Sequence, residues 1–206
     1  MTDDFTYPPA DFTADPDTRL MMAFAAGEDA AFELIVKRFE RQVFGIVCRY
    51  MGNRPLAEDT AQEVFLRVYR LRKSYRPTAR ISTLIYRITA NLCLNVIRDE
   101  SRRRMVSLDA VASDDELSLG ASIGSTAAPA EDAVEARERA EIVRRALAKI
   151  PERQRIALIL HRFEGLSYAE IAESMETNID AVKSLLSRAR ASLAEALRPD
   201  IEAGNL

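Results

Sequence analysis

The chain has 206 residues, of which 48% are hydrophobic and 30% charged, enough apolar material for one large domain or two small ones. Its longest apolar run covers only residues 20–26, too short to span a membrane, and two cysteines are too few for a disulfide framework. We therefore expect a reduced, cytoplasmic protein without membrane insertion.

The net charge of −3 conceals a strong asymmetry along the chain. Residues 67–104 carry 11 basic and two acidic side chains, whereas residues 1–66 and 105–141 are both acidic. A basic block of this size indicates a polyanionic partner such as a nucleic acid.

The N-terminal half reads as a tail followed by four helices. Residues 1–16 contain four aspartates and three prolines, and we expect them to form a disordered acidic tail. From residue 17 to 104 apolar residues recur at helical spacing, interrupted by Gly27, by MGNRP at 51–55 and by a basic loop at 73–82. This pattern predicts helices beginning near Asp17 and Asp29, a third over 56–71 and a fourth over 83–104, in one N-terminal domain.

The fourth predicted helix carries two different faces. Apolar side chains share one of them, and Arg87, Asn91, Asn95, Arg98 and Arg102 recur on another. Carboxamides can pair with base edges while arginines hold phosphates, so this stripe favours nucleic-acid binding. A merely solvated charged face is the alternative interpretation.

The sequence changes character over residues 105–132, which are rich in Ser, Ala, Asp and Gly and show no sustained periodicity. A segment of this length and composition predicts a flexible acidic linker. Helical patterning resumes over residues 133–206, and no part of the chain alternates as a strand would. The expected fold is all-α, with two small helical domains joined by the linker.

The C-terminal domain contains a predicted helix-turn-helix. Ser167 and Glu170 have the spacing of a capping box that opens a short helix, and a second, longer helix extends to about Leu197. The outward face of the longer helix is mostly small and polar, with cations beside it, which suits close approach to a DNA groove. An ordinary helical hairpin is the alternative. The candidate DNA-contacting residues on this helix are Asp180, Ala181, Lys183, Ser184, Ser187 and Arg188.

Three stretches resemble the bacterial sigma-70 family, specifically its small two-domain extracytoplasmic-function members: AEDTAQEVFLRVYR (57–70), ISTLIYRITANLCLNVIR (81–98) and GLSYAEIAESMETNIDAVKSLLSRAR (165–190). The resemblance implies an N-terminal domain that binds core RNA polymerase and opens the −10 element, and a C-terminal domain that reads the −35 element. It implies core polymerase, through its β′ clamp helices and β flap, and promoter DNA as partners. It leaves open whether an anti-sigma factor is a further partner.

The resemblance also assigns roles to individual residues. Asp59, Gln62 and Glu63 match the polar positions that bind core polymerase. The candidate −10 residues combine the family matches with the stripe and the basic loop, and they are Arg76, Arg80, Tyr86, Arg87, Asn91, Asn95 and Arg98.

Three positions depart from the family pattern, and one of them, Leu185, stands where an Arg is frequent, which is expected to shift the −35 preference. Leu84 stands where a Trp is usual, so the wedge or stacking surface at the upstream fork is expected either to be weaker or to fall to Tyr86. Glu176 stands where a Gly usually makes the helix-turn-helix bend, and a Glu at positive φ is costly, so we expect the turn to be rebuilt.

No arrangement of residues indicates catalysis. The chain shows no nucleophile with a matching base and no Gly-rich phosphate loop, and the single His161 has no Cys or carboxylate at metal-ligand spacing. We expect no enzymatic activity and no cofactor. Two other function classes remain: an ordinary helix-turn-helix regulator acting without core polymerase, and an adaptor that imitates a sigma factor.

Overall fold

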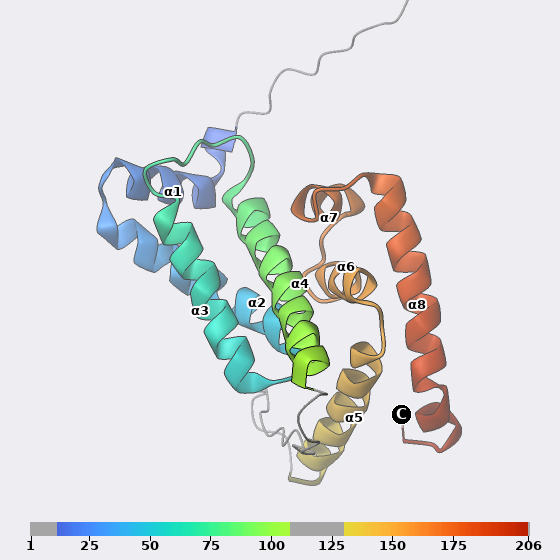
Figure 1. The fold of residues 1–206 in the computed structure, drawn as a ribbon. Helices are drawn as coiled ribbons and strands as arrows, with labels where there is room; N and C mark the ends of the chain where they lie inside the picture. Colours follow the sequence, from blue (N-terminus) through green and yellow to red (C-terminus); the bar gives the residue numbers. More distant parts are fainter. Residues whose placement is uncertain (1–11, 108–129, 206) are drawn as a thin grey trace, which may run out of the picture.

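The computed structural model describes residues 12–107 and 130–205, with side-chain positions over residues 12–98 and 137–205. Over these ranges the chain forms eight α-helices and one short 3-10 helix, and no strand (Figure 1). The all-α prediction is therefore confirmed. Most of the predicted linker and of the acidic tail lies outside the described residues.

Local signals set the bounds of the N-terminal helices. These are a 3-10 helix (Phe12–Ala14), α1 (Pro16–Ala26), α2 (Asp29–Met51), α3 (Arg54–Arg70) and α4 (Ile81–Ser107). The Asp15 carboxylate accepts from the Thr18 N–H at 2.8 Å at the start of α1, and the Asn53 amide oxygen accepts from the Leu56 N–H at 3.0 Å at the start of α3. Gly52 ends α2 in the left-handed region, at φ 68°. The four predicted helices are present, with ends shifted by a few residues.

The C-terminal helices are α5 (Ala130–Ala148), α6 (Glu152–Arg162), α7 (Tyr168–Ser174) and α8 (Ile179–Glu202). The predicted capping box is formed at α7, where Ser167 and Glu170 satisfy each other's backbone N–H groups. The Asn178 amide oxygen accepts from the Ala181 N–H at 2.8 Å and begins α8. The helix-turn-helix is thus α7 followed by α8.

The two halves of the chain pack against each other. Helices α6 and α7 lie between α4 and α8, and α2 contacts both α5 and α6 (Figure 1). The buried apolar side chains form one continuous cluster that extends from Met21 in α1 to Ala189 in α8. Consequently the surface of α4 that faces the C-terminal helices is an internal surface in this structure.

Candidate nucleic-acid interface

The amide-and-arginine stripe lies along one side of α4, and its exposure increases toward the C-terminal end of the helix. Arg87 and Asn91 are half-buried, whereas Asn95 and Arg98 are exposed. Arg98 Nη2 donates to the Asn95 amide oxygen at 3.0 Å, which holds these two polar groups together. The stripe therefore presents cations and amides side by side, as the sequence predicted.

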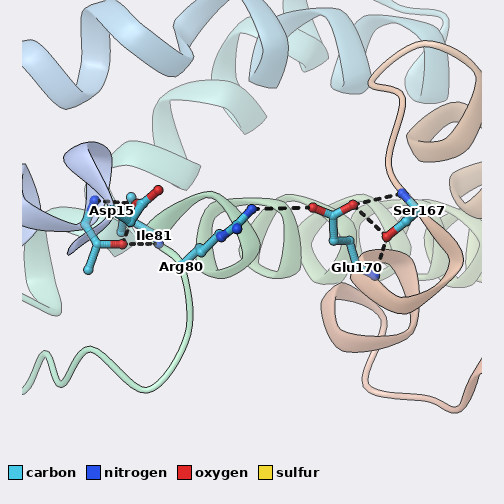
Figure 2. Close-up of polar contacts among 6 residues, drawn as sticks. Asp15, Arg80, Ile81, Ser167 and Glu170 are labelled. Carbon is cyan, nitrogen blue, oxygen red and sulfur yellow. Dashed lines mark hydrogen bonds and ion pairs between the residues drawn. The ribbon is translucent and has the colours of Figure 1, made fainter. Parts of the chain in front are cut away.

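The basic loop before α4 is tied to α1 by one side chain. Thr18 is fully buried, and its hydroxyl donates to the Asp15 carboxylate at 2.7 Å and accepts from the Ile81 N–H at 3.1 Å. Because the Thr18 hydroxyl donates its hydrogen to Asp15, its oxygen lone pairs can accept from the Ile81 N–H. That N–H is at the start of α4 and has no partner within the helix. Figure 2 shows this contact beside Arg80, which precedes Ile81. Arg76 and Arg80 are both exposed on the loop.

Tyr86, which we expected to offer a stacking surface, is instead buried. Its exposed fraction is 8%, and burial raises the pKa of its phenol to about 12, with the Glu164 and Glu170 carboxylates adding to the shift. Both carboxylates belong to the C-terminal half of the chain. Stacking of a DNA base on Tyr86 therefore requires these elements to move away from α4.

Helix α7 and the turn after it contact two of the candidate −10 arginines. Arg80 Nη1 lies 4.0 Å from Glu170 Oε1, and Arg87 Nη1 lies 3.7 Å from Glu176 Oε1 (Figure 2 shows the first pair). Hydrogen bonds from Ser167 lower the pKa of Glu170 most, and Arg80 adds a smaller effect. The sequence indicated only the capping role of Glu170 and gave no sign of either pair, because the partners lie about 90 residues apart.

The turn between α7 and α8 is not rebuilt to avoid positive φ. Glu176 has φ 49°, which makes it the one non-glycine residue with positive φ among those described. Glutamate is uncommon at this conformation because the backbone is strained there, and in this structure the strain is present. The strained residue is also the one that reaches Arg87.

A buried guanidinium joins the two halves a second time. Arg155 in α6 is 8% exposed, and its Nη1 donates to the Tyr50 carbonyl oxygen at 2.9 Å, at the C-terminal end of α2. The same group donates to the carbonyl oxygens of Ala148 and Ile150 and lies over the Tyr50 ring at 4.9 Å. Burial lowers the pKa of this guanidinium and raises that of the Tyr50 phenol. No pattern in the sequence marked Arg155 out.

A third contact between the two halves of the chain lies beside the contact of Arg155 with Tyr50. Arg49 Nη1 is 3.7 Å from Glu164 Oε1, and the Arg49 guanidinium lies 4.4 Å from the centre of the Phe163 ring. The Glu164 side chain is only 8% exposed, and burial raises the pKa of its carboxyl. An ion pair and a cation–π contact thus hold the turn after α6 against the end of α2.

The DNA-contacting face predicted on α8 is open. Its apolar stripe of Val182, Leu186 and Ala189 is buried, mainly against α6. Lys183 Nζ pairs with the Asp180 carboxylate at 3.0 Å, and both side chains are largely exposed. Of the six candidate −35 residues, Ala181 is half-buried. The other five are exposed: Asp180, Lys183, Ser184, Ser187 and Arg188.

The candidate polymerase-binding residues lie on an exposed edge of α3. Asp59 and Gln62 are exposed, and Glu63 is half-buried. Arg67 donates to Glu63 at 2.9 Å, and this hydrogen bond is the main reason that the pKa of Glu63 is lowered. Leu66 falls on the same edge at helical spacing and is 49% exposed. We did not expect Leu66 from the sequence, although its position seven residues after Asp59 was a usable signal.

Among the remaining reactive side chains, His161 is engaged, Cys93 is buried and Cys48 is half-buried. His161 Nδ1 lies 3.0 Å from the Leu166 carbonyl oxygen, and Cys93 is fully buried. The described ranges contain no group of three His, Cys, Asp or Glu side chains arranged to hold a metal ion. No helix within them is long and apolar enough to cross a membrane.

Comparison with known proteins gives matches over both halves. Residues 35–103 match the profile of sigma-70 region 2, and residues 140–193 match that of sigma-70 region 4. The RNA polymerase sigma-H factor of Pseudomonas aeruginosa is 32% identical over 91% of this chain and 96% of its own length. The ECF RNA polymerase sigma-E factor of Escherichia coli K12 is 32% identical over 89% of this chain and 95% of its own length.

Solved structures with this fold include two sigma factors in complexes. CnrH, solved with the cytosolic domain of CnrY, superposes with a TM-score of 0.66 at 21% identity and covers 90% of this chain and 99% of its own. The sigma factor RpoE of Bartonella quintana, solved with the anti-sigma factor NepR, superposes with a TM-score of 0.64 at 22% identity and covers 82% of this chain and 98% of its own. The region 2 match also separates this chain from an ordinary helix-turn-helix regulator, which the C-terminal half alone allowed. The chain belongs to the extracytoplasmic-function RNA polymerase sigma factors of the sigma-70 family, which bind core polymerase and direct promoter recognition and transcription initiation.

Proposed function

We propose that this sigma factor divides its work among three helices: α3 binds the β′ clamp helices of core polymerase, α4 with its basic loop captures the −10 element, and α8 reads the −35 element. The observation that carries the proposal is the stripe on α4, where amides and arginines form one continuous row beside the loop that carries Arg76 and Arg80. With these roles, we place the N-terminal domain, which contains α3 and α4, at residues 17–104 and the C-terminal domain, which contains α8, at residues 133–206.

The −10 role of α4 follows from the chemistry of its side chains. An amide both donates and accepts, so Asn91 and Asn95 suit the edges of bases exposed by melting. Arg98 holds the Asn95 amide oxygen, which orients the amide before DNA arrives. Arg76, Arg80 and Arg87 supply positive charge for the phosphates on either side. Melting costs a few kcal/mol for each unstacked base, and such contacts offset this cost.

The −35 role of α8 depends on two cations with different surroundings. Lys183 is paired with Asp180, and its compact ammonium suits a phosphate. Arg188 is exposed on the same outward face, and its planar guanidinium suits the edge of a guanine. Small neighbours, Ser184 and Ser187, let the helix backbone approach the groove closely.

The polymerase-binding role of α3 combines a polar edge with an apolar side chain. Asp59, Gln62 and Glu63 are accompanied by the exposed Leu66, and an exposed apolar residue within a polar edge is typical of a protein-binding surface. The β flap is the second contact that we propose on the polymerase, made by the C-terminal domain.

The same comparisons support proposals for regulation and location. Two solved relatives were each captured with a partner, the cytosolic domain of CnrY for CnrH and the anti-sigma factor NepR for RpoE. We infer that this chain also binds an anti-sigma factor and that it acts in the cytoplasm, where core polymerase and promoters are found. It contributes specificity to a reaction that the polymerase catalyses.

The polymerase-binding edge can be tested with two matched substitutions. Glu63→Ala removes a carboxylate of this edge together with its pair to Arg67, and Glu40→Ala removes an exposed carboxylate of α2 as the control. We expect Glu63→Ala, and more strongly Gln62→Ala with Glu63→Ala, to weaken binding to core polymerase by about tenfold, with Glu40→Ala unchanged. Binding to labelled core polymerase measures this. Equal affinities for all variants would remove α3 as the binding helix.

A further inference from the structure

The face of α4 assigned to the −10 element is occupied, in this structure, by a part of the same chain. We propose that the acidic edge of α7, formed by Glu170 and Glu176, is an internal binding surface for the −10 helix and competes with promoter phosphates for Arg80 and Arg87. This inference rests on the proposed function of α4, and it names the occupant of that face when the sigma factor is without polymerase.

The spacing of the two ion pairs indicates a specific contact between α7 and α4 and not an accidental one. Arg80 immediately precedes α4 and Arg87 lies seven residues further on, so about two helical turns, roughly 10 Å, separate them on the same side of the helix. Glu170 lies in the first turn of α7 and Glu176 just after its end, and each carboxylate faces one of the arginines. Tyr86, the neighbour of Arg87 in the chain, is 8% exposed. The acidic edge thus contacts both phosphate-binding cations, which stay partly exposed, and the adjoining aromatic ring is buried.

Glu176 makes this contact from a strained backbone. Its φ of 49° is a conformation that glycine adopts without cost and glutamate does not. A glycine at this position would form the same turn but would leave Arg87 without its carboxylate. The presence of a glutamate here is therefore explained by the contact and not by the turn.

The ion pairs are suited to being exchanged. The side chains of Arg80 and Glu170 are 59% and 45% exposed, and those of Arg87 and Glu176 are 41% and 62% exposed, so water and salt screen both pairs. The stronger attachment between the two halves lies elsewhere, at the buried Arg155 and in the continuous apolar cluster. Charged phosphates can thus displace the carboxylates once polymerase has drawn the halves apart.

The −35 face provides an internal reference for this proposal. Arg188, Ser184 and Ser187 on α8 are exposed in the same structure, and α4 does not cover them. Removal of the acidic edge should therefore change −10 binding and leave −35 binding unaltered. A general increase in positive charge would instead raise both.

The test compares three forms of the full chain: the wild type, Glu170→Gln with Glu176→Gln, and a control with Glu173→Gln and Glu195→Gln. The control makes the same change in net charge at two exposed carboxylates, and glutamine at position 170 keeps the acceptor of the capping box. The probes are a fluorescent single-stranded −10 oligonucleotide and a −35 duplex, both from a promoter selected with the wild-type holoenzyme. Each form is measured alone and bound to core polymerase.

Without polymerase, we expect the Glu170, Glu176 double variant to bind the −10 oligonucleotide roughly three- to tenfold more tightly than the wild type, because the exposed pairs no longer favour the closed form. We expect the control to match the wild type, −35 binding to be equal for all three, and the three holoenzymes to bind the −10 oligonucleotide equally. Equal −10 affinity of the double variant and the wild type would overturn the competition, as would an equal gain in the control. If the wild-type holoenzyme itself fails to bind the −10 strand, the assignment of α4 fails, and the competition falls with it.

Discussion

The two helices that we propose bind DNA present similar polar stripes, yet one stripe is partly covered and the other is open. The stripe on α4 borders packed helices and is partly covered, whereas the stripe on α8 faces away from the rest of the chain. The cause is the width of the buried arc on each helix. At roughly 100° per residue, the buried Ile85, Tyr86 and Ala90 spread over nearly half the circumference of α4, while Val182, Leu186 and Ala189 form a narrow band on α8.

The difference shows that a helix with two apolar sides can pack against a different neighbour on each side. One apolar side of α4 packs on α1, α2 and α3, and the other receives α6 and α7. Helix α8 has only one such side, so its polar face has no competitor among the residues that the structure describes. The following predictions test this contrast, from the largest expected effect to the smallest.

The largest effect should come from the buried cation that joins the halves. Arg155→Met leaves the carbonyl oxygens of Tyr50, Ala148 and Ile150 without their donor, and we expect the free energy of unfolding to fall by about 3 kcal/mol. Urea unfolding measures this. Arg153→Met, an exposed neighbour on the same helix, is the control and should change the free energy by less than about 0.5 kcal/mol. If the two variants unfold alike, Arg155 does not hold α6 to α2.

The open face of α8 can be tested by separating its two cations. We expect Arg188→Ala to lose about 1–3 kcal/mol of discrimination between −35 sequences, because a base contact is removed. Lys183→Ala should lower affinity evenly across sequences and reduce the salt slope by about one unit, because a phosphate contact is removed. Binding to a panel of −35 duplexes at several salt concentrations distinguishes them. An equal loss of sequence preference in both variants would contradict this division of roles.

On the covered face, Asn91 is the residue whose role depends most on melting. We expect Asn91→Ala to fold and bind core polymerase normally but to form fewer open complexes on duplex promoters, with about 1 kcal/mol lost and a changed −10 base preference. A template that is already melted should restore most of the rate and keep the altered preference. Transcription from matched duplex and bubble templates measures both. Normal transcription with unchanged preference would show that this side of α4 is only solvated.

The smallest effect concerns the strained turn. Glu176→Gly relieves a positive φ, and we expect thermal unfolding to show a gain of up to about 1 kcal/mol. Glu176→Ala also removes the pair to Arg87 but keeps the strain, so it should give no gain. Equal stability of the two variants would mean that the backbone at this turn stores no strain.

The sequence by itself determined the helices and most of the chemistry on their surfaces. Asp15, Asn53, Ser167 and Asn178 cap helices within three residues of themselves, and the stripe on α4 follows from spacing along one helix. These features depend on contacts between residues that are close in the chain, and such contacts form wherever the local pattern is present. The all-α fold and the helix-turn-helix could therefore be predicted.

Only the tertiary structure decided which of these surfaces are covered. The burial of Tyr86, the pairs of Arg80 with Glu170 and of Arg87 with Glu176, and the contact of Arg155 with Tyr50 all join residues about 80 to 105 positions apart. Each contact is individually weak or conditional on desolvation, and it exists because two apolar faces meet and bring these side chains together. A local pattern shows that α4 has a second apolar side, but it does not show which partner that side receives.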